Sequence, residues 1–60
     1  MSIRVLLADD QALLRSSLSI LIDREPDMEV VGEADDGEEA VRLAIASRPD
    51  VVLMLSLIHI

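Results

Sequence analysis

Residues 3–10 read IRVLLADD, and this stretch decides the fold that we expect for the chain. Its first six residues are apolar except for Arg4, and such a run is typical of a strand that is buried on both faces of a parallel sheet. The stretch then ends at two adjacent acids, Asp9 and Asp10. We therefore expect a central strand whose carboxyl end carries a pair of carboxylates.

Helices and strands alternate after this first strand. Residues 11–24 carry apolar side chains at helical spacing, and a proline two residues later ends the helix. Residues 29–34 form a weaker strand with acids toward both ends, which suits the edge of a sheet. A second helix covers residues 36–48 with an aspartate as its N-cap, and a third strand covers residues 51–54. The apolar sides that we expect consist of Leu14, Leu18, Leu21 and Ile22 in the first helix and of Ala40, Val41, Ala44 and Ile45 in the second.

The order β-α-β-α-β predicts an α/β fold. Its sheet should be parallel, with right-handed crossovers and helices on both faces. In such sheets the functional site lies outside the carboxyl ends of the strands, where the strand order reverses. Asp9 and Asp10 lie at such an end.

Composition excludes several classes of protein. The net charge of −7, from twelve acids against five arginines and no lysine, should repel nucleic acids and anionic membrane surfaces. No apolar run approaches the ~20 residues that cross a bilayer, and cysteine is absent. We expect a cytoplasmic chain that binds neither nucleic acid nor membrane.

The pair Asp9 and Asp10 has two interpretations. Asp10 precedes the first helix, where aspartate is a favoured N-cap, but capping explains only one of the two acids. Adjacent carboxylates repel each other unless a cation lies between them, and Mg²⁺ binds to carboxylate oxygens together with retained waters. The residues alone leave both interpretations open. For the second acidic pair we expect Asp36 to cap a helix and Asp35 to be a solvated charge in a turn.

An ordered series of motifs runs without a gap from about Ile3 to Met54. It consists of IRVLLADD (3–10), LR (14–15), EPD (25–27), VVGEA (30–34) and DGEEA (36–40). In this series the chain resembles the opening of a bacterial response-regulator receiver domain of the NarL/FixJ group. The resemblance implies a flavodoxin/receiver-like fold, truncated here to β-α-β-α-β. It also implies a phosphoacceptor domain of a two-component phosphorelay, whose parent is a DNA-binding transcription regulator.

The resemblance further implies a partner, a metal and a reaction. In receivers a histidine kinase passes a phosphoryl group to an aspartate at the end of the third strand, and the acidic pair after the first strand helps to hold Mg²⁺. By residue match, Asp9 and Asp10 take the metal role here, with Asp10 expected as the direct ligand. The family pattern places the acceptor aspartate directly after Met54, where this sequence has Leu55. We therefore expect an incomplete magnesium site, no catalytic residue, and a segment that is not an enzyme and is inactive as written.

The last six residues, LSLIHI (55–60), form an apolar tail after the receiver-like part at residues 1–54. The codons CTG-TCT-CTT-ATA-CAC-ATC would encode this tail, and that string resembles a transposon end used in DNA library preparation. We therefore expect residues 55–60 to be a translated adapter and not native sequence. The alternative is a native degenerate receiver, and resequencing across the junction separates the two.

Two other functions compete with the phosphorelay. The chain could be a pseudo-receiver that binds a protein partner without phosphorylation, since Leu55 cannot accept a phosphoryl group. An α/β phosphohydrolase would need a second aspartate two residues after a nucleophilic one, and Gln11 stands at that position after Asp9. The third strand would also leave an apolar edge, so we expect the chain to self-associate or aggregate.

Overall fold

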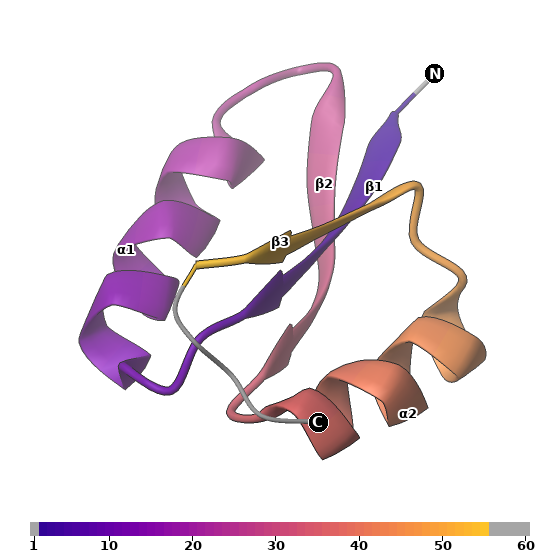
Figure 1. Cartoon of the computed structure of the whole chain (residues 1–60). Coiled ribbons are helices and arrows are strands. Elements are labelled where there is room, and N and C mark those ends of the chain that lie inside the picture. Colours follow the sequence, from indigo (N-terminus) through magenta and orange to yellow (C-terminus); the bar gives the residue numbers. More distant parts are fainter. Residues whose placement is uncertain (1, 56–60) are drawn as a thin grey trace.

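The computed structural model describes residues 2–55, which form a three-stranded parallel sheet with one helix on each side (Figure 1). The elements follow in the order β1 (Ile3–Ala8), α1 (Ala12–Asp23), β2 (Met28–Ala34), α2 (Gly37–Ser47) and β3 (Val51–Met54). The predicted α/β fold and its order of elements are confirmed. The predicted tail at residues 55–60 lies outside the described residues, except for Leu55.

The strand order is β2-β1-β3, so β1 is central and β2 lies at an edge, as predicted. The chain moves from β1 to β2 in one direction and then returns past β1 to reach β3. Because crossovers between parallel strands are right-handed, this reversal places α1 and α2 on opposite faces, as Figure 1 shows. The reversal also creates a switch point between the carboxyl ends of β1 and β3.

The core is built around β1. Val5, Leu6, Leu7 and Ala8 are all fully buried, as expected of a strand that is covered on both faces. Gly32 on β2 is a site of close packing, since a Cβ atom there would lie 3.0 Å from Cδ1 of Leu6. Because Gly32 has no side chain, β2 can pack closely against Leu6 of β1 and Leu43 of α2.

The apolar side of α1 is only partly buried. Leu18 and Ile22 are half-buried against the sheet, whereas Leu14 and Leu21 are exposed although their spacing predicts burial. The reason is that α1 packs mainly on β2, with a smaller contact to β1. Because this contact is narrow, it covers only the row of side chains that contains Leu18 and Ile22, and the rows on either side remain in solvent.

The inner side of α2 also differs from the prediction. Ala40 is buried as expected, but Ile45 is 74% exposed. Leu43 packs against the core cluster in its place. The helix ends at Ser47, and its C-cap is Arg48, the last residue of the predicted range, in the left-handed conformation at φ 48° before Pro49. α2 therefore turns Leu43 toward the core, whereas Ile45, which the sequence pattern places on the inner side, faces solvent.

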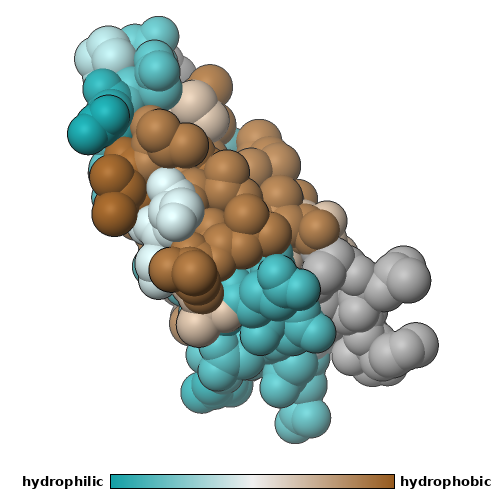
Figure 2. Space-filling view, turned by 90° about the vertical axis from the view of Figure 1, so that its left-hand side faces the viewer, coloured by the Kyte–Doolittle hydropathy of each residue, from teal (hydrophilic) through white to brown (hydrophobic). Residues whose placement is uncertain are grey.

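Exposed apolar surface gathers on α1 and on β3. Figure 2 faces the side of the molecule where α1 lies and shows a continuous hydrophobic area there. The exposed residues of this helix are Leu13, Leu14, Ile20 and Leu21. On β3, Val51, Val52 and Met54 are 41–46% exposed. β3 is therefore the edge at which the predicted self-association would occur, and sedimentation velocity would detect it as species larger than a monomer.

No helix among residues 2–55 is both long and apolar enough to span a bilayer.

Candidate functional site

Asp9 is fully buried at the carboxyl end of β1. Its backbone N–H donates to the carbonyl of Ala34 at 3.0 Å, which extends the pairing with β2 by one residue. Its Oδ1 accepts a hydrogen bond from the backbone N–H of Gln11 at 2.8 Å. Its Oδ2 is buried and has no hydrogen-bond partner among residues 2–55. A buried carboxylate oxygen without a partner is costly, so Oδ2 is suited to a cation or a donor that reaches the site from outside.

Asp10 is exposed and does not cap α1. The helix begins at Ala12, and its N-cap is Gln11, whose side chain makes no capping bond. The N-cap prediction for Asp10 is therefore wrong. The cause is the bond from Gln11 to Asp9, which closes a local turn and moves the start of the helix one residue further along.

Leu55 lies beside Asp9. The backbone N–H of Leu55 donates to the carbonyl of Ala8 at 3.0 Å, so the pairing of β3 with β1 continues past Met54. Ala8 pairs with Met54 in the register of the two parallel strands, and the next pair in that register is Asp9 with Leu55. The two residues thus flank the switch point of the sheet.

The register that brings Leu55 to this position is fixed at the opposite end of the strands. The backbone N–H of Arg4 donates to Oδ2 of Asp50 at 2.8 Å, and the N–H of Asp50 donates to the carbonyl of Arg4 at 2.8 Å. The guanidinium of Arg4 also donates to the carbonyl of Ser47 at 2.5 Å. A slip of β3 along β1 would break the two bonds of Asp50, so these bonds hold Leu55 in register beside Asp9.

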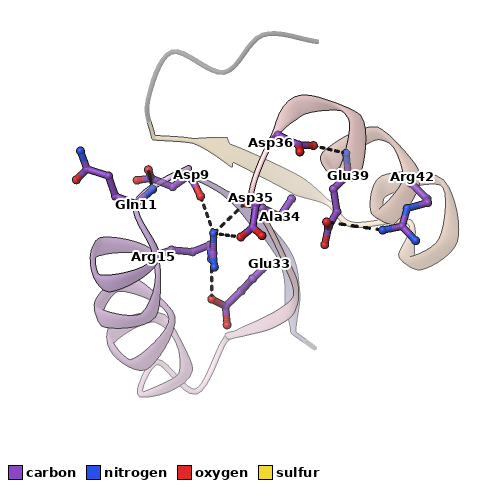
Figure 3. A network of polar contacts seen from close by, with 9 residues as sticks. All are labelled: Asp9, Gln11, Arg15, Glu33, Ala34, Asp35, Asp36, Glu39 and Arg42. Carbon is purple, nitrogen blue, oxygen red and sulfur yellow. Dashed lines mark hydrogen bonds and ion pairs between the residues drawn. The ribbon is translucent and has the colours of Figure 1, made fainter.

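Arg15 of α1 joins both strand ends to the helix (Figure 3). Its Nη1 donates to the carbonyls of Asp9 at 2.6 Å and of Ala34 at 3.4 Å. Nη1 also pairs with Oδ1 of Asp35 at 2.6 Å, and Nε pairs with Oε1 of Glu33 at 3.2 Å. The side chain of Arg15 is only 13% exposed. The guanidinium is therefore a fixed part of this edge of the sheet.

Arg15 is not among the site residues predicted from the sequence. Asp35 is exposed, as expected of a solvated charge in a turn, and it also forms an ion pair with Arg15. A signal for Arg15 exists in the sequence, because it stands three and seven residues before Leu18 and Ile22 and so lies on their side of the helix. A charged residue on the packed side of a helix needs a partner.

Asp36 caps α2 as predicted, since its Oδ1 accepts the backbone N–H of Glu39 at 2.8 Å. A hollow of about 320 Å³ lies at this end of the helix, lined by Asp36, Glu38, Glu39 and Arg42. Figure 3 shows Asp36, Glu39 and Arg42 of this group, whose contacts are separate from those of Arg15. The acids of this hollow are explained by capping and by favourable interaction with the helix dipole.

The residues at the switch point fit a hard divalent cation in part. Asp9 and Asp10 supply carboxylate oxygens, and Mg²⁺ is commonly held by one or two carboxylates with waters in its other positions. The side chain of Leu55 adds no ligand atom. No group of three or more His, Cys, Asp or Glu side chains within residues 2–55 is arranged to hold a metal. Within residues 2–55, this edge can therefore supply two carboxylate ligands.

Comparison with known proteins decides the family. The family model of the response regulator receiver domain matches residues 5–55. The chain belongs to this family. The transcriptional regulatory protein LiaR of Bacillus subtilis is 54% identical over 52 residues, which cover 87% of this chain and 25% of LiaR. The protein-glutamate methylesterase/protein-glutamine glutaminase of Thermotoga maritima is 56% identical over 52 residues, which cover 87% of this chain and 15% of that protein.

Solved receivers share the fold. The response regulator domain of Thermotoga maritima CheB matches with a TM-score of 0.85 and 48% identity over 97% of this chain and 46% of that chain. A LuxR-family two-component response regulator from Aurantimonas sp. SI85-9A1 matches with a TM-score of 0.85 and 41% identity over 95% of this chain and 41% of that chain. The predicted receiver-like fold is thus confirmed, and the chain spans less than half of each solved receiver. Receivers in general bind Mg²⁺ and interact with histidine kinases.

Proposed function

We propose that the chain is the metal-binding part of a receiver phosphorylation site, in which Leu55 stands at the acceptor position. The observation that carries this proposal is the bond from the N–H of Leu55 to the carbonyl of Ala8, which brings residue 55 beside Asp9 at the switch point. Leucine has no oxygen that could attack a phosphoryl group. The chain as written is therefore inactive in phosphoryl transfer.

Asp9 and Asp10 would hold Mg²⁺ in this site. A bound divalent cation offsets the repulsion between a carboxylate nucleophile and the anionic phosphoryl oxygens. The contribution of the chain itself is to hold the two carboxylates in place. Three hydrogen bonds hold Asp9 in place. Its N–H donates to the carbonyl of Ala34, its Oδ1 accepts from the N–H of Gln11, and its carbonyl accepts from the guanidinium of Arg15.

A titration with Mg²⁺ tests the metal role. We expect Asp9→Asn to weaken Mg²⁺ binding by on the order of 10-fold or more, because it removes one of only two anionic ligands. Asp36→Asn is the matched control, because it removes the same charge at a helix start where asparagine caps as well as aspartate does. Its Mg²⁺ affinity should stay near that of the wild type. Equal losses in both variants would show diffuse attraction to an acidic surface and would refute the site.

For the parent protein we propose a transcription regulator that a histidine kinase controls. LiaR is named as a transcriptional regulatory protein, and the resemblance to the NarL/FixJ group implies a helix-turn-helix output domain. The segment itself would bind no nucleic acid, given its net charge of −7. Because the relative from Thermotoga maritima is named as a methylesterase, the full reading frame of the parent gene is the decisive observation. An esterase domain after the receiver would refute a DNA-binding parent.

A second candidate is a pseudo-receiver that binds a partner without phosphorylation. The presence of Leu55 at the acceptor position favours it, as does the exposed apolar surface of α1. Binding to a kinase domain or to another receiver in the absence of Mg²⁺ and phosphodonor would support it. Absence of such binding would leave the first proposal as the only one.

A further inference from the structure

We propose that Arg15 is a positioning residue, whose guanidinium holds the turn at Asp9 and Asp10 in the conformation that binds a divalent cation. The inference rests on the metal role proposed for the two aspartates. Arg15 itself makes no contact with the cation. Its action passes through the main chain at Asp9.

The geometry around Arg15 supports this role. One guanidinium on α1 reaches the carbonyl of Asp9 after β1, at 2.6 Å, and that of Ala34 at the end of β2, at 3.4 Å. Figure 3 shows the guanidinium between the two strand ends, with all of these bonds converging on it. The planar fork of arginine can make several such bonds at once, whereas the single ammonium of lysine is a point charge. Arg15 therefore fixes the distance between the two strand ends at the site.

The charges around the site also support a positioning role for Arg15. Glu33 and Asp35 are acids that could compete with Asp9 for a cation, and Arg15 forms an ion pair with each of them. Its contact with Asp9 is to the main-chain carbonyl, so it leaves the negative charge of the Asp9 carboxylate in place. Arg15 thus offsets part of the charge of the neighbouring acids while it holds Asp9.

A positioning role and a simple charge role predict opposite results. If Arg15 acted only as a nearby positive charge, its removal would raise the affinity for Mg²⁺. If it positions the turn, its replacement lowers that affinity. Arg15→Lys separates the two roles, because lysine keeps the positive charge and lacks the planar guanidinium that makes several hydrogen bonds at once. We expect this variant to bind Mg²⁺ on the order of 10-fold more weakly than the wild type, as for other residues that orient metal ligands.

Arg42→Lys is the matched control. Arg42 is 73% exposed on α2 and pairs with Glu39 of its own helix. The same exchange there should leave the Mg²⁺ affinity unchanged. A second readout needs no metal, namely the hydrogen exchange of the Gln11 amide, which donates to Oδ1 of Asp9. In Arg15→Lys this amide should exchange on the order of 10-fold faster, since a charged hydrogen bond that braces the turn is lost.

The outcomes separate the two proposals. Absence of Mg²⁺ binding by the wild type would refute the metal role, while the Gln11 amide would still report whether Arg15 holds the turn. Normal Mg²⁺ affinity together with unchanged Gln11 exchange in Arg15→Lys would overturn the role of Arg15. If Arg15→Lys does not fold, Asp35→Asn removes an exposed partner of the guanidinium and should speed Gln11 exchange to a smaller extent. Unchanged exchange in that variant would equally contradict the inference.

Discussion

A small-molecule phosphodonor with Mg²⁺ should form no acyl phosphate on this chain, and Leu55→Asp should not restore labelling to the level of an intact receiver. The first result follows because leucine has no oxygen at the position beside Asp9. The second follows from charge. An aspartate at position 55 would add a third carboxylate to Asp9 and Asp10, and a phosphoryl group would bring further negative charge.

The chain has little positive charge with which to balance that site. It contains no lysine, and Arg15 is committed to Glu33, Asp35 and two carbonyls. Its other four arginines lie on β1, after α1, on α2 and after α2. Loss of a single preorganised charge or donor from a transition state commonly costs on the order of 100-fold in rate. We therefore expect Leu55→Asp to be labelled at least ~100-fold more slowly than an intact receiver.

Mass spectrometry of the intact chain measures this labelling, and an intact receiver treated in parallel is the positive control. Treatment with hydroxylamine identifies any acyl phosphate, because it cleaves that bond and leaves phosphate esters of serine unchanged. Robust labelling of Leu55→Asp would show that Asp9, Asp10 and Mg²⁺ suffice for the reaction. Labelling of the wild type would show that a carboxylate other than residue 55 accepts the group.

Leu6→Ala should leave most of the chain unfolded. Leu6 is fully buried on the central strand, and its side chain packs close to Gly32, its partner on β2. Truncation of a buried leucine costs ~2–5 kcal/mol. A domain below about 70–80 residues rarely gains more than ~3–5 kcal/mol from its core. The loss is thus comparable to the entire free energy of unfolding, and the helical signal in far-ultraviolet circular dichroism should largely disappear.

Leu13→Ala is the matched control, because it removes the same atoms from a residue that is 82% exposed on α1. It should change the free energy of unfolding by less than ~0.5 kcal/mol. If both variants lose the helical signal equally, the core does not lie on β1 as described. If neither loses it, the chain is held together by contacts between molecules and not by this core.

The fold could be predicted from the sequence because its strongest signal is local. Residues 5–8 are apolar at consecutive positions, which is typical of a strand buried on both faces, and β1 is such a strand. The cap at Asp36 could be predicted for the same reason, since its partner Glu39 lies three residues away. Close packing at Gly32 followed from the absence of a side chain within a strand.

The details that could not be predicted depend on contacts between distant segments. Arg15 bonds to Glu33 and Ala34, which are 18 and 19 positions away, so spacing along the chain gives no hint of the partners. Asp10 is not the N-cap because Asp9, and not Asp10, is the aspartate that turns inward. The sequence does not show which of two adjacent aspartates will do so. The exposure of Ile45 depends on how α2 lies over the sheet, which periodicity within the helix does not determine.

Mn²⁺ is the most direct probe of the central claim, that the carboxyl edge at Asp9 and Asp10 is a cation site beside residue 55. Mn²⁺ prefers the same oxygen ligands as Mg²⁺, and its unpaired electrons broaden the nuclear magnetic resonance signals of nearby amides. At low Mn²⁺, the amides of Asp9, Asp10 and Leu55 should broaden first, and an excess of Mg²⁺ should restore them. Broadening that begins instead at Asp36 and Glu39, or that spreads evenly over all acidic residues, would contradict the site.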